Sequence, residues 1–147
     1  MNLLSVLAAI AAGAALSIQV GVNNSLRSII GSPILAAFVS FSVGSLCLLA
    51  YALLTRAPWP SLQTVSKVPV WAWLGGALGA YYIATSIFVA PKLGAASLIS
   101  ILVTAQLCTS LILDHFGAVG FAQHSINAWR IFGALLLVGG VVLIVRN

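Results

Sequence analysis

An apolar segment from Leu93 to Gly117, long enough to cross a membrane, constrains the fold of this sequence more than any other feature. A helix needs about 20 apolar residues to cross a hydrocarbon core of about 30 Å. Similar segments recur, and we expect helices at about 3–22, 33–54, 70–90, 94–114 and 129–145. Period-two alternation is missing, which disfavours a transmembrane barrel. The sequence therefore predicts an all-α integral membrane protein, with residues 1–147 forming a single five-helix domain.

The composition excludes several classes of protein. With 62% hydrophobic and 5% charged residues, the chain lies outside the range of soluble domains. The net charge of +5 comes from scattered bases rather than a basic patch, so we expect contact with lipid headgroups and not with nucleic acid. Cys47 and Cys108 fall inside predicted helices, and neither a disulfide, a metal site nor a cofactor is predicted. The N-terminus has no basic region, so we expect its apolar segment to stay as a helix rather than act as a signal peptide.

A polar stripe marks the segment from Leu93 to Gly117. Gln106, Ser110 and Asp114 are four residues apart, so they lie on one side of a helix. A polar stripe on a spanning helix must face protein or water. The stripe therefore predicts the lining of a cavity and makes transport a candidate function.

Asp114 has two interpretations. It lies near the end of its helix, where a carboxylate is cheaper to hold than at mid-membrane, and it can pair with His115 or with another nearby base. Alternatively, Asp114 and His115 form a proton-coupling site, because an imidazole titrates near neutral pH.

The first predicted helix carries small residues on the same face as Gln19 and Asn23. Amides bond between membrane helices, so Gln19 is either a packing contact or part of a site. Asn23, followed by Asn24 and Ser25, is typical of a helix end and a loop.

The second and third predicted helices carry small-residue faces. Gly44 lies on a face with Ala37, Ser40 and Cys47, which we interpret as a packing surface because its serines can bond back to their own helix.

Gly75 and Gly79 form a small-xxx-small pair, and Tyr82 and Ser86 continue their face. A buried tyrosine hydroxyl needs a partner, so Tyr82 is expected to meet Gln19, Gln106 or a substrate.

The basic residues give no preferred orientation. Five spans place the chain ends on opposite sides, with three bases on each side: Arg56, Lys67 and Arg130 on the side of the N-terminus, and Arg27, Lys92 and Arg146 on the other. The positive-inside rule therefore selects neither orientation. A chain that inserts both ways could pair antiparallel with itself and so form the inverted repeat of many transporters.

Four segments together resemble the YdcZ branch of the drug/metabolite transporter superfamily. Members of this branch are described as inner-membrane exporters with five helices. The four segments are IQVGVNNSL (18–26), APKLGAAS (90–97), AQLCTSLILDHFG (105–117) and RIFGALLLVGG (130–140). The resemblance implies a bacterial inner-membrane protein that forms half of a ten-helix transporter, with polar positions at Gln19, Asn23, Gln106 and Asp114. Two departures are Ala105, where the family suggests glycine, and the absence of a glutamate from the first helix. The carboxylate-centred exchange of the small multidrug transporters is therefore not carried over.

These observations lead to one main hypothesis and one alternative. The main hypothesis is a secondary transporter that exports a small molecule by alternating access as an inverted homodimer. Its predicted substrate-binding residues are Gln19, Asn23, Tyr82, Ser86, Gln106 and Ser110, with Gly44, Gly75 and Gly79 for helix packing. Neutral amides favour a polar neutral or zwitterionic substrate. The alternative is a non-transporting membrane subunit or assembly factor, whereas an enzyme is not expected because no catalytic constellation or phosphate-binding loop is present.

Overall fold

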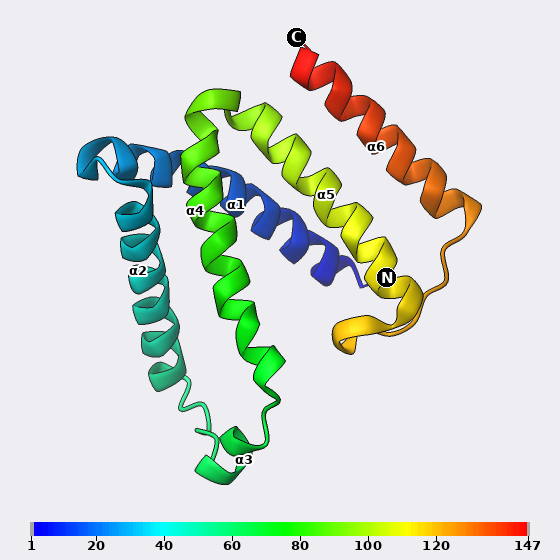
Figure 1. Ribbon diagram of the computed structural model, residues 1–147. Helices are drawn as coiled ribbons and strands as arrows, with labels where there is room; N and C mark the ends of the chain where they lie inside the picture. The colour runs from blue at the N-terminus through cyan, green and yellow to red at the C-terminus, as the bar shows by residue number, and fades with distance from the viewer. Residues whose placement is uncertain (1, 147) are drawn as a thin grey trace. The chain divides into compact units, whose positions relative to one another are not determined.

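The computed structural model describes residues 2–146, and every regular element in that range is helical. The long helices are α1 (Leu3–Ile30), α2 (Pro33–Leu54), α4 (Leu74–Leu93), α5 (Ala95–Phe116) and α6 (Ala128–Arg146) (Figure 1). The 3-10 helix η1 (Val70–Trp73) leads into α4, while α3 (Leu62–Ser66) and η2 (Ala118–Gly120) lie in connections. Five segments of the described chain are long and apolar enough to cross a membrane, so the predicted all-α fold with five spans is confirmed.

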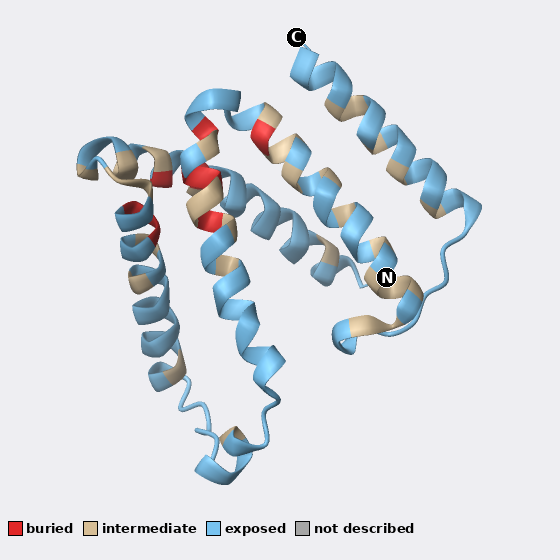
Figure 2. Ribbon diagram, in the orientation of Figure 1, coloured by how far each residue is buried: buried red, intermediate tan, exposed pale blue. Residues whose placement is uncertain are grey.

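The chain packs as two compact units, one ending at Pro91 and the other beginning at Lys92. In the first unit, Ala36 and Ala37 of α2 pack against Ile83 and Ile87 of α4. Leu26 of α1 and two further residues of α4, Tyr82 and Ala84, pack against this core. Figure 2 shows that these helices are otherwise largely exposed along their length. That exposure suits a chain whose outer surface meets lipid, because lipid is as apolar as the side chains themselves.

The first helix is longer than the sequence predicted. Its predicted end at residue 22 was wrong, because Asn23 is buried on the helix and does not begin a loop. The helix continues to Ile30 and ends at Gly31, whose φ of 79° lies in the left-handed region. The Gly31 N–H donates to the carbonyl of Arg27 at 2.8 Å and so satisfies one of the last carbonyls. Ser32 then caps α2, its hydroxyl accepting from the Leu35 N–H at 3.3 Å.

The connection between α2 and α4 is not entirely loop. Prolines at positions 58, 60 and 69 prevent one continuous helix, but α3 forms between them. The Ser61 hydroxyl caps α3 by accepting from the Thr64 N–H at 3.2 Å. Trp59, Trp71 and Trp73 flank this short helix and are exposed, as expected for aromatic residues at a membrane interface.

The second unit is a helical hairpin of α5 and α6, which run antiparallel (Figure 1). The chain enters α5 through Gly94, at a φ of 77° that only glycine adopts readily. It leaves α5 through Gly117, at a φ of 59°. That the whole chain forms one domain stays a prediction.

The turn between α1 and α2 gives a test of the longer first helix. Replacing Gly31 by valine forces a β-branched residue into the left-handed region, so we expect a loss of about 1–2 kcal/mol in the free energy of unfolding. Thermal unfolding of the purified protein in lipid nanodiscs measures it. Gly21→Val is the matched control, because Gly21 lies inside α1 with open space around its Cβ position. Equal stability of the two variants would contradict the observed helix end.

Candidate functional site

A pocket of about 300 Å³ lies between α1 and α2. Gln19 lines it from α1, and the α2 side is formed by Ser40, Phe41, Gly44, Ser45 and Leu48. The α2 residues recur at intervals of four and therefore share one face of that helix. The structure thus places Gln19, predicted as a site residue, opposite Gly44, predicted as a packing residue.

The polar side chains of the first unit differ in how they are satisfied. Ser86 is 2% exposed, and its hydroxyl donates to the carbonyl of Tyr82 at 2.7 Å, so its own helix satisfies it. Asn23 is 3% exposed and lies one turn beyond Gln19 on α1. Neither amide makes a side-chain hydrogen bond within the described residues. The half-buried Tyr82 packs against the core, and its hydroxyl is not bonded to Gln19.

The predicted stripe on α5 is only partly covered. Gln106 and Ser110 are exposed, whereas Asp114 is half-buried. Within residues 2–146, the hydroxyl oxygen of Thr104 is buried without a hydrogen-bond partner. Sequence reasoning missed Thr104, because its position on α5 gives no sign of which neighbours cover it.

Asp114 pairs with Arg130, with Oδ2 and Nη1 at 3.3 Å. Asp114 lies in the last turn of α5 and Arg130 in the first turn of α6. Each charge lies at the unfavourable end of its own helix dipole. Because the helices are antiparallel, each also lies beside the favourable end of the neighbouring helix. The sequence left two partners open for Asp114, His115 or another nearby base. The structure pairs it with a base on the next helix, Arg130.

Hydrogen bonds hold the connection between α5 and α6 against the helix ends. The His124 N–H donates to the carbonyl of Asp114 at 2.7 Å, and Arg130 Nη1 donates to the carbonyl of His124 at 3.1 Å. Gln123 donates to the carbonyl of His115 at 3.0 Å. The Ile126 N–H donates to Nδ1 of His115 at 3.3 Å, which requires that this nitrogen carry no proton. Protonation at Nδ1 is therefore incompatible with this bond.

The three glycines predicted for packing have different surroundings. A Cβ atom placed on Gly79 would lie 3.5 Å from Cζ of Phe41, which is ordinary van der Waals contact, so the Phe41 side chain of α2 reaches α4 there. Cβ atoms placed on Gly44 or Gly75 would meet nothing within 4 Å. The residues described contain no group of three or more His, Cys, Asp or Glu side chains suited to a metal ion.

The five apolar helices of the described chain define a multi-pass membrane protein. Residues 4–143 match the family described as "Putative inner membrane exporter, YdcZ", and the chain belongs to that family. It is similar to the Inner membrane protein YdcZ of Escherichia coli (strain K12), with 36% identity over 85 residues. That match covers 58% of this chain and 56% of the relative. No solved structure matches the chain.

Membership of this family, together with five apolar helices, makes the chain an inner-membrane protein. The predicted family and location are therefore confirmed. The family name indicates an exporter rather than an enzyme. The roles of the individual side chains stay predictions.

The hairpin electrostatics lead to a quantitative expectation. Asp114→Asn removes the charge from a half-exposed ion pair, with side-chain exposures of 32% for Arg130 and 26% for Asp114. Ion pairs exposed to this degree contribute about 0–1 kcal/mol, so we expect a stability loss below about 1 kcal/mol. Thermal unfolding in nanodiscs at low and high salt measures the loss. Arg130→Gln is the companion variant. A loss of several kcal/mol would mean that the pair is buried in the assembled protein.

Proposed function

We propose that this protein is a secondary transporter that exports a small molecule by alternating access, as a homodimer of two oppositely oriented chains. The observation that carries the proposal is the exposure of Gln106 and Ser110 on the apolar helix α5. An unpaired amide in hydrocarbon is unfavourable by about 4–8 kcal/mol relative to water. A second protein surface or a water-filled path must therefore cover Gln106.

Low burial of the spanning helices leaves surface for a second copy as well as for lipid. At most 17% of the residues in any spanning window are buried within one chain. Two copies supply ten spans, and the equal number of bases on each side permits both orientations. An antiparallel pair would have the inverted architecture that supports alternating access in other transporters. Its inward-open and outward-open states would be equal in energy by symmetry.

Proton coupling is proposed for Asp114 and His115. The His115 ring bonds to the α5–α6 connection only while Nδ1 can accept from the Ile126 N–H. Its protonation would release that bond beside the Asp114–Arg130 pair. A proton gradient could thus alter the hairpin at one side of the membrane.

Dual topology has a direct test. We expect a C-terminal reporter to be detected on both sides of the membrane for the wild-type chain. Removing Arg56 and Lys67 leaves one base on the side of the N-terminus, so the C-terminus of this variant should lie in the cytoplasm only. Removing Arg27 and Arg146 should place the C-terminus outside. Paired reporters active only in the cytoplasm or only outside it measure the distribution.

Co-expression provides the control for function. Each variant of fixed orientation should be inactive alone, and the two together should restore export. A wild-type reporter on one side only would contradict the antiparallel homodimer.

Export itself can be measured without knowing the substrate. Mass spectrometry of the medium should detect at least one solute enriched by cells that produce the wild-type chain. We expect Gln106→Leu to remove this enrichment, because leucine cannot hydrogen-bond to a substrate, while cross-linking still detects the dimer. Phe116→Leu, at another exposed position of α5, is the matched control. Loss of the dimer in Gln106→Leu would instead support the alternative of a structural amide in a non-transporting subunit.

A further inference from the structure

We propose that the pocket between α1 and α2 binds a small uncharged molecule that has a hydrogen-bonding edge and an apolar or aromatic face. The pocket of about 300 Å³ lies entirely within the first compact unit. Ligand binding at the pocket does not depend on the proposed function. Only the identification of this ligand with the exported substrate rests on it.

The pocket lies near the middle of the membrane-spanning helix α2. A helix rises 1.5 Å per residue, so Gly44 lies about 16 Å from Pro33 in a helix about 33 Å long. Little water reaches this depth from the lipid side. Polar groups at the pocket therefore interact strongly with any ligand that satisfies them.

Three polar side chains at the pocket make no hydrogen bond within the described residues. Ser42, on the same helix, donates to the carbonyl of Phe38 at 2.9 Å. Ser40 and Ser45 make no such bond among the residues described, although both line the pocket. Together with Gln19, they offer hydroxyl and amide groups that both donate and accept. These groups fit a ligand with hydroxyl or amide functions.

The pocket contains no ionisable side chain. Its six lining residues are Gln19, Ser40, Phe41, Gly44, Ser45 and Leu48. A charged ligand would lose its water there without gaining a counter-charge, which is strongly unfavourable. The site therefore selects against ions.

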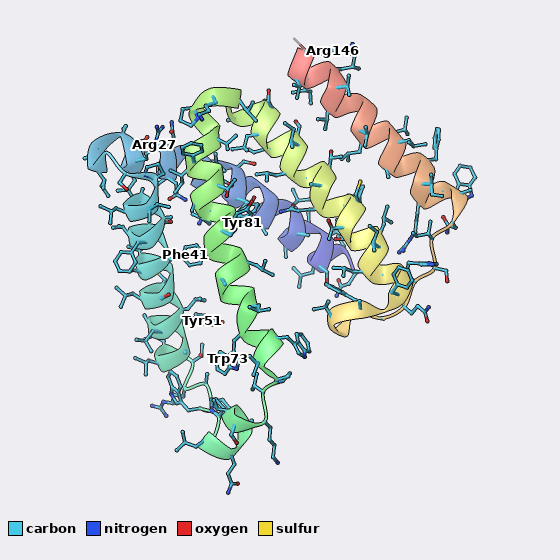
Figure 3. All side chains as sticks on the ribbon, viewed as in Figure 1. Arg27, Phe41, Tyr51, Trp73, Tyr81 and Arg146 are labelled. Atoms are coloured by element: carbon cyan, nitrogen blue, oxygen red, sulfur yellow. The ribbon has the colours of Figure 1, made fainter. Side chains whose placement is uncertain are left out.

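Phe41 and Leu48 form the apolar part of the lining. Phe41 is labelled in Figure 3, on α2. Its ring reaches α4, with Cζ 3.5 Å from the Cβ position of Gly79, so α4 supports one edge of the ring. A flat ligand can contact the remaining ring surface, since aromatic rings prefer offset or edge contacts.

Gly44 leaves open the space that the ligand would occupy. A Cβ placed there meets nothing within 4 Å. At about 30 Å³ per water molecule, the pocket of about 300 Å³ holds on the order of ten waters. A ligand of roughly ten non-hydrogen atoms fits this volume.

The test measures thermal unfolding of the full chain in nanodiscs with benzamide, a neutral aromatic amide of suitable size. Benzoate is the charged probe of the same shape. We expect benzamide to raise Tm in proportion to the logarithm of its concentration above the dissociation constant, by about 3 °C at ten times that constant, and benzoate to have no such effect. Gly44→Leu places an apolar side chain in the pocket, with open space at its Cβ position, and should abolish the rise. Gly76→Leu, on α4 and also with open space at its Cβ position, should retain it.

A second variant separates binding from folding. Gln19→Met keeps the length of the side chain but cannot bond to the amide, so the dissociation constant should rise about tenfold, the equivalent of one or two lost hydrogen bonds. Equal responses to benzamide in the wild type and Gly44→Leu would overturn the pocket assignment. A response to benzoate as large as that to benzamide would overturn its neutral selectivity, and no response to benzamide would overturn the ligand class.

These outcomes are independent of the export measurement. If benzamide binds as expected but the medium shows no enriched solute, the pocket remains a ligand site and the proposed export fails. If export is observed but Gly44→Leu exports as well as the wild type, the pocket is not the substrate site.

Discussion

The absence of water from the hydrocarbon core governs this structure. Helices satisfy their backbone groups internally, so only polar side chains are left to be paired. Several serines pair within their own helix, including Ser17, Ser42, Ser86 and Ser100, at 2.6–3.2 Å from carbonyls one turn earlier. The amides of Gln19, Asn23 and Gln106 are not paired in this way. These three amides therefore have hydrogen-bonding groups that their own helices leave without a partner.

The helix ends follow the same constraint near the membrane surface. Gly31, Gly94 and Gly117 adopt positive φ values that allow abrupt reversals. The α5–α6 connection is longer, and its hydrogen bonds to Asp114, His115 and Arg130 replace contacts with water. A polar connection held in this way keeps Asp114 beside the start of α6, where the helix dipole favours its charge.

The number of membrane-spanning helices could be predicted because length and hydropathy alone determine it. The end of α1 could not, since an asparagine such as Asn23 is equally suited to a loop and to a buried helix position. Nor could the neighbour of Gln19 be predicted. Lipid and protein interior are both apolar, so periodicity does not distinguish the faces of a spanning helix. Ser40 and Gly44 were recognised as one face, but whether that face packs or borders a pocket depends on how far α1 stands from it.

Depth in the membrane connects the pocket with the proposed assembly. A two-fold axis in the membrane plane leaves a mid-membrane site at its own depth, so both copies of the α1–α2 pocket would lie equally far from the two surfaces. The same axis moves the Asp114–Arg130 hairpin of one chain to the opposite surface from that of its partner. One His115 would then face each compartment, while the binding pockets remain equivalent. An inverted pair would thus place its two α5–α6 connections in different solutions.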